Sequence, residues 1–105
     1  PEIVVGDRFG MSSDPELTNL VISILKQHEF KVAKNTPFAG AFITKHHGKV
    51  KKRIHALQLE IDRSLYMDEE KISPNSEFEE LKTRLFPALI QISSLICKSD
   101  KIAAE

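Results

Sequence analysis

The first part of the chain shows two patterns of apolar residues, one typical of strands and one typical of a helix. The run Ile3–Val5 is continuously apolar, as in a strand that is covered on both faces. Asp14 and Pro15 suit the cap and first turn of a helix, and apolar residues then recur at helical spacing up to His28. Phe30–Lys34 alternates as a second strand. Together these elements predict one right-handed βαβ unit.

Two further strands are predicted in the middle of the chain. Ala41–Thr44 is apolar and follows turn-forming residues, and Ile54–Ile61 lies between a basic loop and an acidic turn. One helical turn could also accommodate the second stretch, but its shortness and its flanks favour a strand. Strand alternation then places four residues on one face, namely Ala56, Gln58, Glu60 and Asp62.

The last third of the chain predicts a long helix, Glu77–Lys98, because its apolar residues recur at helical spacing. Ser76 and Glu79 have the spacing of a capping box, and Pro87 should kink the helix. We therefore expect an α/β fold with three layers, α/β/α, around one mixed sheet of four strands. A length of 105 residues suits one core, so residues 1–105 are expected to belong to a single domain.

The composition narrows the functional classes. There are 15 basic and 15 acidic residues, so global charge does not suggest nucleic acid as a partner. The basic segment 45–53 can attract small anions, but it lacks the interleaved aromatic residues on which bases stack. The single cysteine, Cys97, excludes a disulfide framework and favours a reducing, intracellular location. The sequence shows no apolar run of membrane-spanning length and no signal peptide. A start at Pro1, directly before a strand, suggests a fragment or a processed product.

Three places in the sequence carry candidate chemistry. A buried Glu60 would need hydrogen bonds, a cation or a metal, whereas the same residue on an edge strand in water would need none. Asp7 and Arg8 follow a buried strand, where open α/β sheets place their sites, although the two could also pair in water. His46 and His47 are adjacent, so on a strand they would face apart, and this loop alone is not expected to hold a metal.

Several stretches together resemble one family, the N-formylglutamate amidohydrolases. Gly6–Gly10 followed by Asp14-Pro15 is similar to the family's GDRFGTS…DP stretch. Asn35–His46 resembles its N-x-P-[YF]-x-G-G-[YF]-I-T-[RK]-H segment. His55–Ile61 resembles H-A-[LV]-Q-[LI]-E-[IL], and Leu65–Glu69 completes the pattern. The resemblance covers residues 1 to about 70, in the family's order, and it is to the family's carboxyl-terminal half.

The resemblance implies a zinc-dependent amide hydrolase with a fold similar to that of the zinc carboxypeptidases (phosphorylase/hydrolase-like), present here as a partial domain. Its substrate would be an N-formyl or N-acyl amide of glutamate or a similar acidic amino acid. The implied setting is histidine degradation in the cytoplasm. In such chemistry a carboxylate on a strand shuttles the proton of the attacking water.

Residue roles follow from the same resemblance. Glu60 matches the position of the catalytic base. The positions expected to bind the substrate are Asn35, Lys45 and His46. The expected supporting residues are His55, Asp7 and Arg63.

The sequence also departs from the family's pattern. Ala41 replaces a usual glycine, Lys45 stands where arginine is common, and His47 stands where tyrosine is frequent. A lysine cannot offer a carboxylate the two-pronged fork of arginine. The family's zinc-binding histidines lie in the amino-terminal half, so we expect no metal ligand in this chain and no activity from it alone.

Two readings of function therefore stand open. The first is a fragment of a zinc-dependent amidohydrolase. The second is a non-catalytic α/β interaction module that retains the scaffold without the metal-binding half. A partial sheet should expose apolar surface, so either reading predicts self-association or pairing with the missing half. Neither nucleic acid nor a membrane is an expected partner.

Overall fold

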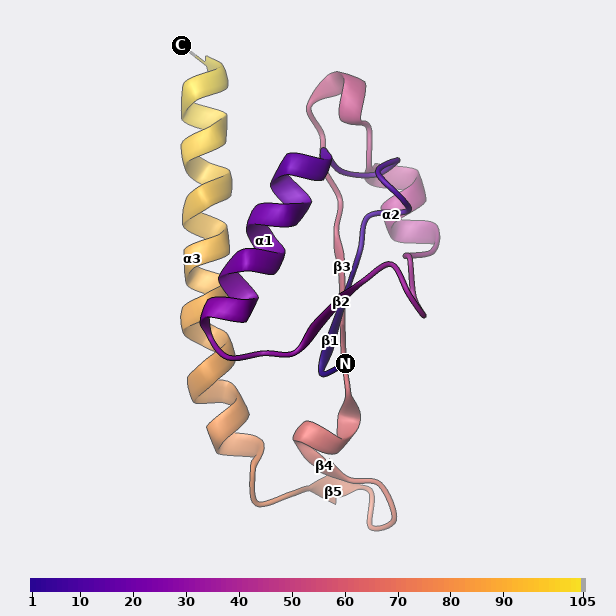
Figure 1. Cartoon of the computed structure of the whole chain (residues 1–105), viewed down its shortest axis with the longest axis vertical. Helices are drawn as coiled ribbons and strands as arrows, with labels where there is room; N and C mark the ends of the chain where they lie inside the picture. Colours follow the sequence, from indigo (N-terminus) through magenta and orange to yellow (C-terminus); the bar gives the residue numbers. More distant parts are fainter. Residues whose placement is uncertain (105) are drawn as a thin grey trace. The chain divides into compact units, whose positions relative to one another are not determined.

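The computed structural model describes the backbone of residues 1–104 and the side chains of residues 1–95 (Figure 1). The chain divides into two compact units, Pro1–Asp62 and a second that begins at Arg63. Within the described part of the chain, no helix combines the length and the hydropathy that crossing a lipid bilayer requires.

The first unit is built on a mixed three-stranded sheet. Strand β1 (Ile3–Gly6) lies in the middle and pairs in parallel with β2 (Val32–Lys34), with Ile3 opposite Val32. Strand β3 (Gln58–Ile61) lies antiparallel on the other side of β1, which gives the order β2-β1-β3. The predicted parallel βαβ connection is confirmed.

Helix α1 (Pro15–Gln27) joins β1 to β2 and runs alongside the strands (Figure 1). It begins as predicted, because the Asp14 carboxylate accepts a bond from the Glu16 amide at 2.9 Å and Pro15 occupies the first turn. The core consists of residues of β1, of the apolar stripe of α1 and of the segment that follows it, namely Ile3, Val4, Val5, Val21, Ile24, Leu25 and Phe30. Burying each of the larger side chains contributes about 1.5–3 kcal/mol.

The strand predicted at Ala41–Thr44 is wrong, because the chain forms helix α2 (Phe42–His47) there. The Lys45 amide bonds to the Ala41 carbonyl at 3.0 Å, as in a helical turn. The apolar pattern was misleading because Phe42 and Ile43 are exposed while Thr44, the polar residue of the run, is buried. Gly40, with φ of 106°, turns the chain just before the helix.

The strand predicted at Ile54–Ile61 is confirmed only in its last four residues, which form β3. A single-turn 3₁₀ helix, η1 (Val50–Lys52), precedes it, and Ile54 then makes an isolated bridge to Lys49. Ala56 exchanges two bonds with Ser12, since its amide donates to the Ser12 carbonyl at 2.8 Å and its carbonyl accepts from Ser12 Oγ at 2.9 Å. These residues therefore bind the β1–α1 loop instead of extending the sheet.

The second unit contains a 3₁₀ turn, a small hairpin and a long helix. The turn is η2 (Arg63–Leu65), and the hairpin pairs β4 (Met67–Asp68) with β5 (Ser73–Pro74). Between them the predicted acidic turn is present, with the Asp68 carboxylate accepting from the amides of Glu70 and Lys71.

Helix α3 (Phe78–Ala104) matches the predicted long helix at its start and extends further than predicted. At the start of α3 the observed capping hydrogen bond is not the one predicted for a capping box of Ser76 and Glu79. Asn75 Oδ1 accepts instead from the Glu77 amide at 3.0 Å. Pro87 lies inside the helix, and the kink expected there stays a prediction. The side chain of Cys97 lies outside the described residues.

The class of fold is confirmed as mixed α/β with a mixed sheet. The three-layer arrangement and the assignment of residues 1–105 to one domain stay predictions.

Candidate active site

Asp7, which follows β1 directly, is fully buried and is the centre of a hydrogen-bond network. Its Oδ1 accepts from the Gly10 amide at 3.0 Å and from Asn35 Nδ2 at 2.8 Å. Its Oδ2 accepts from Thr18 Oγ1 at 2.8 Å. The carboxylate therefore connects the ends of β1 and β2 with the β1–α1 loop and with helix α1.

The protonation of Asp7 follows from these contacts. Burial by itself would raise the pKa of the carboxyl group, because it disfavours the charged form. The bonds from Asn35, Gly10 and Thr18, together with the positive charge of Lys34, outweigh that cost and hold the pKa of Asp7 below its ordinary value. Asp7 is thus an ionised structural group near neutral pH.

Asn35, a predicted substrate-binding residue, is buried and uses its side-chain amide on Asp7. Its Nδ2 donates to the Asp7 carboxylate, and its Oδ1 accepts from the Asp7 amide at 2.9 Å. Its backbone is left-handed, with φ of 61°, a conformation that asparagine tolerates better than most residues. The geometry supports a positioning role, and direct contact with a substrate stays a prediction.

Glu60 and Asp7 lie on opposite faces of the sheet. Directly opposite residues of an antiparallel pair share a face, so Glu60 lies beside Val4, and Gln58 beside Gly6. The other face is covered by α1, since Thr18 reaches Asp7 and Lys34 Nζ reaches Asn19 Oδ1 at 3.3 Å. Glu60 therefore faces away from α1.

Glu60 is exposed on this face, where it lies opposite Val4 and close to Gln58. Gln58 Nε2 donates to Glu60 Oε1 at 3.5 Å, which is long for a hydrogen bond and therefore weak. The carboxylate is thus open to water or to a bound molecule. The sequence alternation that grouped Glu60 with Gln58 agrees with this geometry, but it assigned no role to Gln58.

The segment leading into α2 reaches the same face. A Cβ placed on Gly6 would lie 2.7 Å from the backbone carbon and oxygen of Ala39. Because Gly6 shares its face with Gln58, Ala39 must cover the Glu60 side of the strand end. The Arg8 amide fixes this approach by donating to the Ala39 carbonyl at 2.8 Å. Lys45 and His46, both exposed, follow on α2.

Gly6→Ala is expected to destabilise the first unit because its methyl group would collide with the Ala39 backbone. Overpacking of this kind costs about 1–3 kcal/mol, more than the gain of about 0.4–1 kcal/mol from a less flexible unfolded chain. Urea unfolding, monitored by circular dichroism, measures the difference in the free energy of unfolding between Gly6→Ala and the parent chain. An unchanged midpoint would show that Ala39 does not approach the strand end this closely.

The predicted separation of the two adjacent histidines is wrong because they lie on a helix instead of a strand. The rings of His46 and His47 meet edge to face, with centroids 4.9 Å apart. His46 also stacks on Phe42, with centroids 5.3 Å apart. Among the described residues no group of three or more histidine, cysteine, aspartate or glutamate side chains is arranged to hold a metal ion.

His55 holds the start of α1. Its Nδ1 accepts from the backbone amide of Asp14, the capping residue, at 3.0 Å. The supporting role predicted for His55 stays a prediction. Arg63, another predicted supporting residue, is the first residue of the second unit. Its Nε lies 3.7 Å from Oε1 of the exposed Glu69.

Two residues of this site were missed in the sequence. Thr18, fully buried, donates to Asp7, and Ser12, also buried, bonds to Ala56. A signal for Thr18 was present, because it lies at helical spacing from Val21 and Leu25 on the buried face of α1. A polar side chain on such a face needs a hydrogen-bond partner. No comparable pattern marked Ser12.

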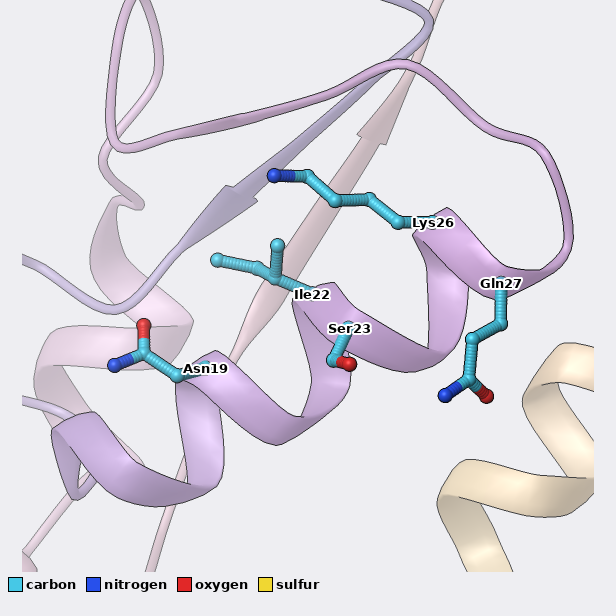
Figure 2. A pocket seen from close by; sticks show the side chains of 5 residues that line it. All are labelled: Asn19, Ile22, Ser23, Lys26 and Gln27. Atoms are coloured by element: carbon cyan, nitrogen blue, oxygen red, sulfur yellow. The ribbon is translucent and has the colours of Figure 1, made fainter.

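A hollow lies on the surface of α1. Figure 2 shows the five side chains that line it, spaced along successive turns of this helix: Asn19, Ile22, Ser23, Lys26 and Gln27. None of them belongs to the predicted site. They bring together no acid–base pair, so the hollow offers no chemistry comparable with that of Glu60.

The sequence is similar to one protein family and to two curated proteins. A family model described as N-formylglutamate amidohydrolase matches residues 1–67. The N-formylglutamate deformylase of Pseudomonas aeruginosa is 34% identical over 71 residues, which are 67% of this chain and 27% of that protein. The N-formylglutamate deformylase of Pseudomonas putida is 36% identical over 70 residues, which are 66% of this chain and 26% of that protein.

A solved structure shows the same similarity in three dimensions. The crystal structure of an N-formylglutamate amidohydrolase from Ralstonia eutropha JMP134 superposes with a TM-score of 0.87 at 32% identity. The superposition covers 93% of this chain and 35% of that one. The chain therefore spans about a quarter of the curated relatives it matches and about a third of this structure.

Proposed function

The chain belongs to the N-formylglutamate amidohydrolase family, and from this premise we propose that it forms part of an enzyme that hydrolyses the formyl amide of N-formylglutamate. The resemblance seen in the four sequence motifs is confirmed by the family match. The names of the curated relatives support amide hydrolysis as the reaction class. Related N-acyl amides of acidic amino acids belong to the same proposal.

The observation that carries the proposal is the placement of Glu60. Its carboxylate is exposed, and its bond to Gln58 is long and easily exchanged. It also lies on a rigid strand that pairs with the buried β1. A base held on a sheet keeps its orientation while water and substrate exchange around it.

The reaction then follows from the chemistry of the amide bond. One Glu60 carboxylate oxygen takes a proton from a water molecule as the water oxygen forms a bond to the formyl carbon. When the C–N bond breaks, the same carboxyl group returns that proton to the departing amine. The products are formate and glutamate, and Glu60 ends the cycle ionised as it began.

Recognition of the acidic substrate is assigned to α2 and the residues around it. Lys45 and His46 are exposed on α2, where the positive charge of Lys45 attracts the carboxylates of the substrate and the His46 ring offers them a hydrogen bond. The Asp7–Asn35 pair and the His55–Asp14 contact act indirectly, by fixing the loops from which α2 and α1 start.

We further propose that the complete enzyme depends on zinc, with all metal ligands outside this chain. The described residues do not fit a zinc site by themselves, because a zinc hydrolase needs about three protein ligands and these residues bring no three such groups together. Zinc would supply Lewis acidity toward the amide carbonyl. The proposed setting is the cytoplasm, supported by a composition with a single cysteine, and histidine degradation, which rests on the resemblance.

The test is formate release from N-formylglutamate by the complete enzyme, with Lys45→Met as the informative variant. Lysine binds the substrate carboxylate equally in ground and transition states, so KM should rise with little change in kcat. Loss of a charged hydrogen bond costs about 1.5–3 kcal/mol, which corresponds to a rise in KM of about ten- to hundredfold.

Lys51→Met is the matched control, because it removes the same charge from an exposed residue of η1. Its KM should stay within about twofold of that of the parent enzyme. An equal rise in KM in both variants would mean that Lys45 acts only through the general field of the basic segment. Absence of formate release by the unmodified, complete enzyme would reject the proposed function.

A further inference from the structure

Arg8 lies in a left-handed turn between β1 and α1. Its φ is 51°, and that of the next residue, Phe9, is 57°. Residues other than glycine rarely adopt this conformation, and such positions are found most often at binding sites, where the surroundings enforce them. Here the Arg8 amide donates to the Ala39 carbonyl at 2.8 Å, and the Arg8 carbonyl accepts from the Met11 amide at 3.2 Å. The Arg8 side chain therefore starts from a fixed backbone.

The stem of the Arg8 side chain packs against the turn that leads into α2. A Cβ on Gly40 would lie 3.4 Å from Cγ of Arg8, and Figure 1 shows the loop after β1 next to α2. The same turn covers the end of β1, because a Cβ on Gly6 would lie 3.0 Å from the Gly40 nitrogen. Gly6 lies opposite Gln58 and so shares the face of Glu60. The Arg8 stem is therefore at the end of the sheet face that carries the candidate base.

The positive charge of Arg8 has no counterpart in the described part of the chain. Arg8 is half-buried, but the carboxylate of its neighbour Asp7 accepts from other groups, among them Asn35 and Thr18. The sequence left open that Asp7 and Arg8 pair in water, and in the structure they do not. Among the side chains of residues 1–95, no carboxylate lies within ion-pair distance of the Arg8 guanidinium.

An acidic substrate supplies the carboxylate that Arg8 lacks. N-Formylglutamate carries two carboxylates, one at its α-carbon and one on its side chain, so two cations are needed to neutralise both. Lys45 provides one cation, but an ammonium group cannot offer a carboxylate the two parallel N–H donors of a guanidinium. Arg8 and α2 lie on the same glycine, since a Cβ on Gly40 would also be 2.6 Å from Oγ1 of Thr44, the residue before Lys45.

We propose that Arg8 binds one carboxylate of the acidic substrate through its guanidinium fork, while Lys45 attracts the other. This assignment rests on the proposed function and extends it to the recognition of a dicarboxylate. The fork that Lys45 cannot provide on α2 is thus supplied by the β1–α1 loop, and the left-handed turn at Arg8 holds it beside α2.

The test measures kcat/KM of the complete enzyme for N-formylglutamate, for N-formylglutamine, in which an amide replaces the side-chain carboxylate, and for the α-amide of N-formylglutamate. Arg8→Met should lower kcat/KM for N-formylglutamate by about ten- to hundredfold, the usual effect of losing a charged hydrogen bond. For one of the two amides the change should stay within about twofold, because the carboxylate that Arg8 binds is already absent. An amide that is not turned over is measured by its inhibition constant instead.

Arg53→Met is the matched control. Arg53 is also an arginine with a left-handed backbone, with φ of 60°, but it is exposed at the end of η1. Its kcat/KM should stay within about twofold of the parent value for every substrate, as expected for an exposed charge. Arg8→Lys should recover part of the loss, because lysine keeps the charge without the fork. Circular dichroism of each variant verifies that the fold is retained.

Three results would overturn the assignment while the parent enzyme still releases formate and the proposed function stands. The first is an unchanged kcat/KM for N-formylglutamate in Arg8→Met. The second is an equal loss in that variant for all the substrates, because Arg8 would then act on the fold and not on a carboxylate. The third is the same selective loss in Arg53→Met. Absence of formate release by the parent enzyme would reject the proposed function, and this assignment with it.

Discussion

Glu60→Gln is expected to lower the turnover of the complete enzyme by about a hundredfold to ten-thousandfold, the usual loss when a general acid–base group is removed. Glutamine keeps the shape of the side chain and its place beside Gln58, but it cannot take the proton from water. KM and zinc content should remain nearly unchanged, because the proposed role involves neither metal binding nor the substrate carboxylates. Steady-state kinetics with metal analysis of the purified variant measures all three quantities.

Asp62→Asn is the control for this experiment. Asp62 lies two residues beyond Glu60, is also exposed, and undergoes the same change from carboxylate to amide. Its turnover should stay within a few-fold of the parent value. Near-normal turnover in Glu60→Gln would reject the catalytic role. Loss of zinc from that variant would make Glu60 a metal ligand instead.

Asp7→Ala is expected to destabilise the first unit by about 3 kcal/mol or more. It would leave the buried Asn35 amide and the part-buried Gly10 amide without their acceptor, and Thr18 Oγ1 would keep only its longer bond to the Asp14 carbonyl at 3.2 Å; each unsatisfied donor costs about 1–3 kcal/mol. The free energy of unfolding in urea at neutral pH measures this loss. A loss below about 1 kcal/mol would show that the loops are held together by other contacts.

The pH dependence of stability tests the charge of Asp7 separately. Because its pKa is lower in the folded chain than the ordinary value of 3.8, its stabilisation is complete above about pH 4 and is lost as the pH falls through the folded pKa. Asp7→Asn should remove this part of the acid dependence. Asp14→Asn, at an exposed cap where both residues serve equally well, should leave it unchanged. Identical acid profiles for Asp7→Asn and the parent chain would contradict an ionised Asp7.

The helices and strands that have strong local sequence signals were predictable from the sequence. Asp14 and Pro15 marked the start of α1, the continuous apolar run marked β1, and the spacing of apolar residues marked α3. These signals succeed because capping, fixed φ and hydrophobic periodicity act within a few residues of the chain. The alternation that grouped Gln58 with Glu60 also succeeded, because the side-chain period of a strand is local.

Where burial decided the outcome, the sequence misled. Ala41–Thr44 has the composition of a strand, but β2 and β3 flank β1 and this segment is not paired in the sheet. It turns at Gly40 into a helix that leaves Phe42 and Ile43 exposed. Likewise, Ile54 and Ala56 extend the apolar pattern of β3, but their hydrogen bonds go to Lys49 and Ser12. The apolar character of a residue indicates that burial would stabilise it, but it does not indicate which element will cover it.

By itself the sequence determined the family, the βαβ unit and the identity of the candidate base, because motifs, caps and periodicity are encoded in neighbouring residues. Only the tertiary structure decided that Asp7 and Asn35 bind each other and that Asp7 and Glu60 lie on opposite faces of the sheet. Asp7 and Asn35 are 28 residues apart in the chain, and a contact at that separation depends on the parallel pairing of β1 with β2. Such pairing arises from the packing of the whole unit, so no local pattern could reveal it.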